Sequence, residues 1–317
     1  LVASAISWQL TRDAKYAQKV RTFLMRLSDP TQGYPSTLQG CSQAWVQEGH
    51  FFQNIARSYD AIRDSGLLSD QDQQQIEASL RIYMDFVSRY PAGIGNWDIS
   101  ALTGAVYCAL AVQDWDKLDE YLNGPCCLVW QLRRGVMDDG WWYECSPGYN
   151  LWCAQEYTEI GLALKPWGEN FLDKTYPAVF SYDVRMGAKV GNDEVGEGEH
   201  GINFNLWGPN TRPGRQIKDM WNSLTELLNE DGKMFGINDA NPELGETTSR
   251  YDLAYAAYGD KRYADIVQRG DVKKRNLLYG VPELPVTPKG QKLPTTKSDN
   301  AGVAILRSQA QTQTPHE

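Results

Sequence analysis

The segment Ser7–Ala17 reads Ser-Trp-Gln-Leu-Thr-Arg-Asp-Ala-Lys-Tyr-Ala, the pattern of one amphipathic helix ending, a short turn and a second helix beginning. A similar segment covers Ala254–Ala264, and a looser copy covers Ala109–Leu118. Each has an Asp where the second helix would be capped. We therefore predict a mainly α fold made of helical hairpins. Their uneven spacing is unlike a regular solenoid and favours an incomplete (α/α) toroid, closed or horseshoe-shaped.

The character of the chain changes after Gly280. The segment Val281–Pro288 is rich in proline and has no helical pattern, which is typical of a linker. Asn300–Ser308 then alternates apolar and polar residues as a strand does, and a single strand is not stable alone. We expect residues 1–280 to form the toroid, and residues 281–317 to hold a linker and the first strand or strands of a β domain that is largely absent from this chain.

Charge restricts the classes of partner. The 317 residues include 40 acidic and 31 basic side chains, a net charge of −9. Such a chain is not a general binder of nucleic acid or anionic membranes, and no apolar run is long enough to cross a bilayer. A polyanionic substrate would need a local basic cluster, for which the candidates are Arg133, Arg134, Arg212 and Arg215. The six cysteines have no zinc-site spacing, so we expect buried thiols, and bridges stay open if the protein is exported.

The segment Asp139–Asn150 has the most chemical content. Ser146 followed by Pro147 is a helix-start pattern, in which the serine oxygen would cap backbone N–H groups. This places Tyr149 in the first helical turn, where the positive end of the helix dipole would favour phenolate. Trp141 and Trp142 lie just upstream and would offer apolar faces to a ligand. The combination suits proton transfer on a sugar ring.

Two other helix starts have polar or aromatic residues. Glu48 and His50 are predicted to open a helix that runs to about Asp64, and Asn96 and Trp97 to open another. These starts and that of Tyr149 are about one hairpin apart, so in a toroid they would open at the same rim. Asn96 has an alternative role as a simple helix cap.

These residues resemble a known family, the heparinase II/III-like polysaccharide lyases. The resemblance is carried by Asn96–Trp97, by Asp139–Gly140 through Tyr149, by Gly236–Asp239 and by the strand from Asn300. It implies an (α/α) toroid joined to an antiparallel β-sandwich. It also implies β-elimination of a uronic-acid polysaccharide, in which Asn neutralises the uronate carboxylate and Tyr transfers a proton, often with a His. Asn150 and Trp97 stand where members of that family often have His, which leaves the second base open.

Elimination across a 4-linked uronate removes the C5 proton, so the adjacent carboxylate must be neutralised, a base must reach C5, and an acid must protonate the bridging oxygen. We expect Asn96 to neutralise the carboxylate and Tyr149 to transfer the proton. Tyr149 can be both base and acid when the two leaving groups lie on one face of the ring, and a His is needed as a separate base when they lie on opposite faces. His50, or His200 in the Gly-rich acidic loop Gly196–Gly201, would be the further catalytic group. The candidate substrate-binding residues are Gln47, Glu48, Trp97, Trp141, Trp142, Glu144, Asn150 and Arg212. No metal site is predicted.

Two other functions stay open. A glycoside hydrolase on an (α/α) toroid would use paired carboxylates, for which Glu48, Asp98, Asp139 and Glu144 are available. A non-catalytic glycan-binding protein is the second. The sequence requires no cofactor, and a structural divalent metal in the absent part of the β domain stays open. We expect the protein to be periplasmic or secreted, of bacterial type, with the targeting signal not present in this chain.

Overall fold

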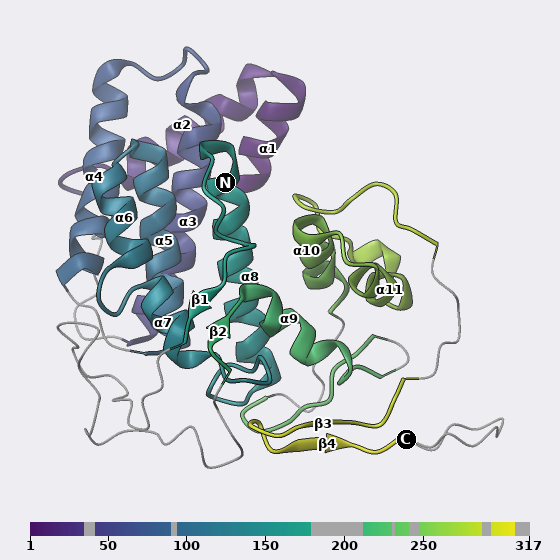
Figure 1. Cartoon of the computed structure of the whole chain (residues 1–317). Coiled ribbons are helices and arrows are strands. Elements are labelled where there is room, and N and C mark those ends of the chain that lie inside the picture. The colour runs from purple at the N-terminus through teal and green to yellow at the C-terminus, as the bar shows by residue number, and fades with distance from the viewer. Residues whose placement is uncertain are drawn as a thin grey trace. The chain divides into compact units, whose positions relative to one another are not determined.

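The structure, a computed structural model, describes residues 1–34, 42–89, 94–178, 212–229, 232–240, 247–286 and 293–307, without the side chains of 42–45 and 272. These residues are mainly helical, as predicted, with a few short strands (Figure 1). They form two compact units, unit 1 up to Gln131 and unit 2 from Leu132 onward. The boundary lies inside helix α7 (Leu128–Gly135). The predicted domain boundary near Gly280 stays a prediction.

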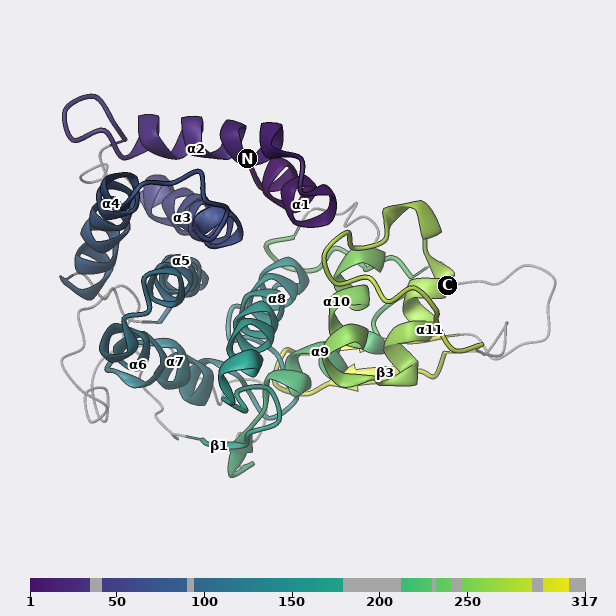
Figure 2. The same ribbon diagram turned by 90° about the horizontal axis from the view of Figure 1, so that it is seen from above.

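Unit 1 contains three consecutive helical hairpins. They are formed by α1 (Val2–Thr11) with α2 (Ala14–Leu27), α3 (Ser42–Arg63) with α4 (Asp70–Arg89), and α5 (Asn96–Val112) with α6 (Trp115–Asn123). Helix α3 packs between the α1–α2 hairpin and α5, and α4 packs against α2, α3 and α5 (Figure 2). The predicted series of hairpins is therefore confirmed for this unit, whereas closure into a toroid stays a prediction.

Helices α3 and α5 approach each other closely at two glycines. A Cβ atom placed on Gly49 of α3 would lie 2.3 Å from the Ser100 carbonyl oxygen of α5. A Cβ atom on Gly104 of α5 would lie 2.6 Å from the Gly49 carbonyl oxygen. Glycine normally weakens a helix interior, and here it is required because only a hydrogen atom fits between the two backbones.

The three sequence repeats share one turn geometry. The first helix ends at a left-handed residue, which is Arg12 (φ 56°), Gln113 (φ 55°) or Gly259 (φ 63°). The next residue is an Asp that caps the second helix, accepting a hydrogen bond from the backbone of Lys15, Lys117 or Arg262. The predicted Asp caps are therefore confirmed, and they explain why hairpins distant in the chain turn alike.

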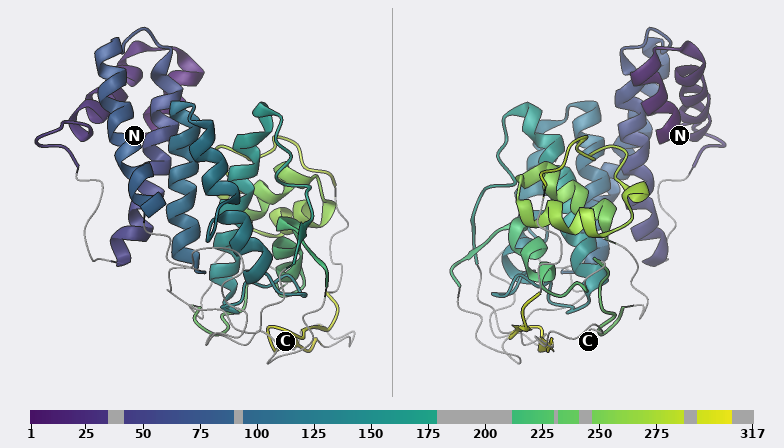
Figure 3. Two further views of the ribbon diagram at one scale, coloured as in Figure 1. Left: turned by 60° about the vertical axis from the view of Figure 1, so that its left-hand side comes forward. Right: turned by 90° about the vertical axis from the view of Figure 1, so that its right-hand side faces the viewer.

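Unit 2 is built on helix α8 (Pro147–Leu164) and the short 3-10 turn Lys165–Trp167 that continues it. Helix α9 (Ile217–Thr225) and the hairpin of α10 (Thr248–Tyr258) and α11 (Lys261–Arg269) pack with it, α8 contacting α9 and α10 (Figure 3). Strands β1 (Tyr176–Pro177) and β2 (Gly214–Arg215) pair antiparallel, and a second 3-10 turn covers Val272–Lys274.

The predicted terminal strand is shorter than expected and has a partner. Strand β4 (Val303–Ile305) pairs antiparallel with β3 (Thr296–Ser298), and Asn300 lies in the turn between them. The Asp139 carboxylate accepts hydrogen bonds from the backbone N–H groups of Asn300 and Ala301, both at 3.0 Å, and so holds the turn. Residues 281–286 contain no helix, in agreement with the predicted linker. A β-sandwich around this hairpin stays a prediction.

Candidate functional site

Tyr149 lies in the first turn of α8, as the sequence predicted. Ser146 is the residue before the helix and Pro147 is its first residue. The predicted capping by the Ser146 side chain is wrong, because its hydroxyl donates a hydrogen bond of 3.0 Å to the Asp239 carbonyl oxygen instead. The serine therefore joins the start of α8 to the segment that contains Asp239.

The hydroxyl of Tyr149 donates a hydrogen bond to the carboxylate of Asp239, at 3.0 Å. Tyr149 is half-buried and Asp239 is exposed, so a ligand can reach the pair. The two residues are 90 positions apart in the chain. The hydrogen bond thus connects two of the segments on which the family resemblance rests, Asp139–Tyr149 and Gly236–Asp239. Tyr149 and Asp239 form an accessible tyrosine–carboxylate pair.

The same two segments meet at a second pair of residues. The side-chain amide of Asn238 donates a hydrogen bond of 3.2 Å to the Glu144 carbonyl oxygen. Asn238 (φ 58°) and Cys145 (φ 53°) both have left-handed backbone conformations. Asparagine tolerates this region, whereas cysteine rarely adopts it. The backbone at Cys145 is therefore held in an unfavourable conformation directly before the helix that carries Tyr149, as is common in segments that position functional groups.

The predicted preference of Tyr149 for phenolate is wrong. The pKa of Tyr149 is raised above its ordinary value, mainly because its hydroxyl donates to Asp239, and further because of partial burial and the negative charges of Asp239 and Glu144. All of these effects act against phenolate formation. The phenol is thus held protonated and is suited to give a proton to a substrate.

Glu144 is a second titratable group at this site. Burial raises the pKa of its carboxyl, the charge of Asp239 raises it further, and the hydrogen bond from the Trp142 indole opposes both. That bond is 2.6 Å long and reaches the Glu144 carboxylate. Glu144 is half-buried. It is therefore a carboxyl group that binds a proton more readily than an exposed glutamate does.

The aromatic residues before Tyr149 support the site from within. Trp141 and Trp142 are both fully buried, so the prediction that they stack on a ligand is wrong. The Trp141 indole donates to the Ser298 hydroxyl at 3.1 Å. Asn150 is also fully buried, accepting from the Trp142 backbone at 2.7 Å and donating to the Met220 carbonyl at 2.9 Å. Its predicted contact with substrate is wrong for the same reason.

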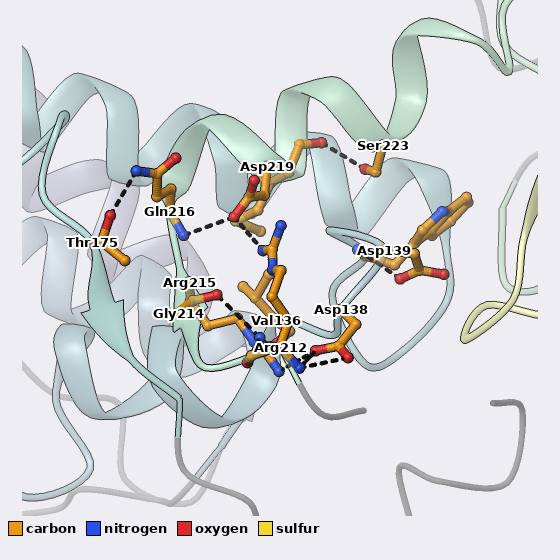
Figure 4. A network of polar contacts seen from close by, with 12 residues as sticks. Val136, Asp138, Asp139, Thr175, Arg212, Gly214, Arg215, Gln216, Asp219 and Ser223 are labelled. Atoms are coloured by element: carbon orange, nitrogen blue, oxygen red, sulfur yellow. Dashed lines mark hydrogen bonds and ion pairs between the residues drawn. The ribbon is translucent and has the colours of Figure 1, made fainter. Parts of the chain in front are cut away.

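The predicted basic cluster is mostly engaged within unit 2. The Arg215 side chain is 1% exposed and pairs with Asp138 at 2.9 Å, so it presents nothing to a ligand (Figure 4). The Arg212 guanidinium pairs with Asp219 of α9, and its backbone N–H donates to Asp138 (Figure 4). Arg212 is partly exposed. In this network it helps to hold the start of α9, and its predicted contact with substrate stays a prediction.

The remaining candidates belong to unit 1. Asn96 is the first residue of α5, and Gly95 occupies the cap position, so the alternative role of Asn96 as a cap is wrong. Asn96 is 5% exposed, and its side-chain amide makes no hydrogen bond to any residue that the structure describes. The neighbouring Trp97 is 44% exposed and can stack on a ligand. The Trp97 ring is therefore suited to contact a ligand, whereas contact of the buried Asn96 amide with a substrate stays a prediction.

Helix α3 begins earlier than predicted. It starts at Ser42, so Glu48 and His50 lie in its interior and not at its first turn. The segment Ser42–Gln47 contains no helix breaker and continues the helix backward. Glu48 is buried beside Tyr34, Gln47 is exposed and His50 is half-buried. His200 lies outside the described residues.

Comparisons with known proteins assign no family, because no protein-family model matches the chain and a search among curated proteins finds no significant match. Among the residues that the structure describes, no helix is long and apolar enough to cross a membrane. The same residues contain no group of three or more His, Cys, Asp or Glu placed to hold a metal ion.

Proposed function

We propose that the protein is a polysaccharide lyase that cleaves a uronic-acid polysaccharide by β-elimination, acting in the periplasm or outside the cell. The observation that carries this proposal is the accessible hydrogen bond between Tyr149 and Asp239 at the start of α8. The packed helical hairpins of unit 1 support the proposed toroid. The β3–β4 hairpin supports a β-sandwich that follows it. The resemblance to heparinase II/III-like lyases agrees with the same proposal.

The protonated state of Tyr149 defines its role. A phenol held protonated by Asp239 gives its proton to the bridging oxygen as the glycosidic bond breaks. The Asn96 amide neutralises the uronate carboxylate, so that negative charge at C5 can move onto it. A neutral imidazole, from His50 or His200, takes the C5 proton. The proposal thus assigns the acid, the group that neutralises the carboxylate and the base to side chains of this protein.

Digestion of defined polymers tests the proposal. The full chain is incubated with alginate, heparin, heparan, chondroitin, hyaluronan, ulvan and glucuronan, and the products are followed by ultraviolet absorbance and by reducing-end assay. We expect at least one polymer to give the absorbance of a 4,5-unsaturated uronate. Reducing ends without that absorbance would instead indicate a hydrolase, and neither signal would indicate a binding protein.

One observation favours hydrolysis as the second candidate function. The pKa of Glu144 is raised by burial and by the charge of Asp239, and a glycoside hydrolase needs a carboxyl group that stays protonated as its general acid. Glu144 would then be the general acid. Asp139, expected earlier as an available acid, is instead engaged with the backbone of the β3–β4 turn.

Replacing Asp239 by Asn is expected to move the basic limb of the pH–rate profile to lower pH. Asparagine can still accept the hydrogen bond from Tyr149 but has no charge, so the pKa of the phenol falls. A general acid is active below its pKa and is lost as pH rises through it. In Asp239→Asn the fall of kcat/KM with rising pH should therefore set in at a lower pH than in the unsubstituted chain. Measuring kcat/KM over a range of pH checks this.

The direction of that shift separates two roles. If Tyr149 acted as a base through its phenolate, the same variant would gain activity at neutral pH, because more phenolate would form. Asp173→Asn is the control, since it removes an exposed carboxylate from the same unit. An unchanged basic limb in Asp239→Asn, with an unchanged melting temperature, would contradict the assignment of Tyr149 as the acid.

Asn96→Ala is expected to lower turnover by about 10²-fold, because the substrate carboxylate then stays charged in the transition state. The loss of stability should be below the roughly 1 kcal/mol of a lost cap, since Gly95 holds the cap position. Kinetics and thermal melting of the same sample check both parts. Asn96→Asp should be equally inactive because it adds a charge, whereas Asn123→Ala on α6 is the control. Full activity in Asn96→Ala would refute the role.

A further inference from the structure

The hydrogen bond between Tyr149 and Asp239 is formed in contact with solvent. Asp239 is exposed and Tyr149 is half-buried, so water competes for the phenol hydroxyl and for the carboxylate. Holding two such side chains in one geometry also costs conformational entropy. A pair of this kind is maintained when other contacts fix the backbone that carries it, and the contacts around Asp239 therefore bear on the state of Tyr149.

Two side chains attach the segment that contains Asp239 to the start of α8. Residues 236–240 lie in no helix or strand, so a regular ladder of backbone hydrogen bonds does not fix them. The hydroxyl of Ser146 donates a hydrogen bond of 3.0 Å to the Asp239 carbonyl oxygen. The amide of Asn238 donates one of 3.2 Å to the Glu144 carbonyl oxygen. Asp239 is thus held on its own carbonyl group and through the residue before it.

Ser146 is used differently from an ordinary helix cap. A serine directly before a helix usually accepts a hydrogen bond from the backbone of the first turn. The Ser146 side chain does not cap α8, and it is fully buried with its hydroxyl directed to Asp239. A buried hydroxyl that loses its partner is left without compensation for its desolvation. The bond from Ser146 to Asp239 therefore resists opening more than the exposed bond from Tyr149 does.

We propose that Ser146, assisted by Asn238, is a positioning residue for Tyr149, and that it acts by holding the backbone of Asp239 so that the carboxylate receives the phenol hydroxyl. The start of α8 contacts Asp239 at two atoms, since Ser146 donates to its carbonyl oxygen and Tyr149 to its carboxylate, both at 3.0 Å. The inference rests on the proposed function for the role of Tyr149 as the acid. Ser146 itself acts through Asp239 and not on the substrate.

Nuclear magnetic resonance of the full chain, with its tyrosines labelled with ¹³C at Cζ, tests the proposal apart from catalysis. The signal of Tyr149 is identified by its absence in Tyr149→Phe, and its chemical shift at neutral pH reports the hydrogen bond of the hydroxyl. Asp239→Ala removes the carboxylate and defines the shift of a phenol without this partner. Ser146→Ala should move the signal in the same direction and by a comparable amount, because the carboxylate is then no longer held in place.

A double variant and a matched control separate positioning from a general loss of structure. Ser146→Ala added to Asp239→Ala should cause no further shift, because the serine then has no carboxylate to position. Ser58→Ala is the control, since Ser58 is another fully buried serine, and its hydroxyl donates to the Asn54 carbonyl oxygen within α3. Equal Tyr149 signals in Ser146→Ala and Ser58→Ala would overturn the proposal.

Asn238→Gly is the variant that decides if Ser146→Ala does not fold. Asn238 is exposed and has a φ of 58°, which glycine adopts without strain, so this substitution removes the amide and leaves the backbone conformation available. It should move the Tyr149 signal in the same direction as Asp239→Ala does. An unchanged signal in Asn238→Gly would then overturn the proposal.

The positioning of Tyr149 and the lyase activity can fail separately. On a cleaved polymer, Ser146→Ala should lower kcat by about 10-fold with little change in KM, because placement of the acid is lost and substrate binding is not. If the Tyr149 signal shifts as expected but the unsubstituted chain gives no unsaturated product, the positioning is supported and the lyase proposal fails. If unsaturated product forms and Ser146→Ala matches the control in signal and in kcat, the lyase proposal is supported and the positioning fails.

Discussion

Tyr149→Phe is expected to lower kcat by about 10²- to 10⁴-fold, the usual contribution of a general acid, while leaving the fold intact. The substitution keeps the aromatic ring at the start of α8 and removes only the hydroxyl that donates to Asp239. Initial rates of unsaturated-product formation measure the effect. Affinity for the intact polymer should change little, because the lost interaction acts in the transition state.

Tyr255→Phe is the matched control for this variant. Tyr255 is a half-buried tyrosine of α10 in the same unit, and its hydroxyl makes no hydrogen bond to a described residue. The control should keep the activity of the unsubstituted chain. If Tyr149→Phe retained more than about a tenth of that activity, Tyr149 would not be the general acid, and Glu144 would become the first group to examine.

Asp138→Ala is expected to destabilise unit 2 by about 3–5 kcal/mol, the usual cost of removing one partner of a buried ion pair. Asp138 pairs with the fully buried Arg215 and also accepts a hydrogen bond from the Arg212 backbone (Figure 4). Without Asp138 the Arg215 guanidinium loses its ion-pair partner in a place where burial already lowers its pKa. Denaturant unfolding of the full chain measures the loss.

Two further variants make this prediction testable even if Asp138→Ala does not fold. Asp138→Asn keeps an acceptor for the Arg212 backbone but removes the charge, so we expect a smaller loss of stability. Asp173→Ala removes an exposed carboxylate from the same unit and should change stability by less than about 0.5 kcal/mol. Asp138→Ala and Asp173→Ala with equal stability would show that the ion pair with Arg215 does not stabilise the fold.

Local sequence determined the elements whose signals are contiguous in the chain. The aspartates of the hairpin turns, such as Asp13 and Asp260, cap their helices as predicted, because a cap depends on the backbone of the next two or three residues. Pro147 and Tyr149 occupy the first turn of α8 for the same reason. Where continuation of a helix depended on weaker propensities, as at the start of α3, the prediction of its first residue was wrong.

The composition of the candidate site could be predicted only in part. Tyr149 was identified from the sequence, but its partner Asp239 was noted only as part of the segment Gly236–Asp239, with no role. Trp141 and Trp142 were expected to face a ligand, because an aromatic pattern does not distinguish a core residue from a binding residue.

The sequence by itself thus determined that this is a mainly α protein of helical hairpins with a tyrosine at a helix start. Only the tertiary structure decided that Asp239 accepts a hydrogen bond from the hydroxyl of Tyr149 and raises its pKa. The physical reason is one of range. Caps and helix starts follow from hydrogen bonds within a few residues, whereas burial, ion pairing and pKa depend on groups that approach only when segments distant in the chain pack together.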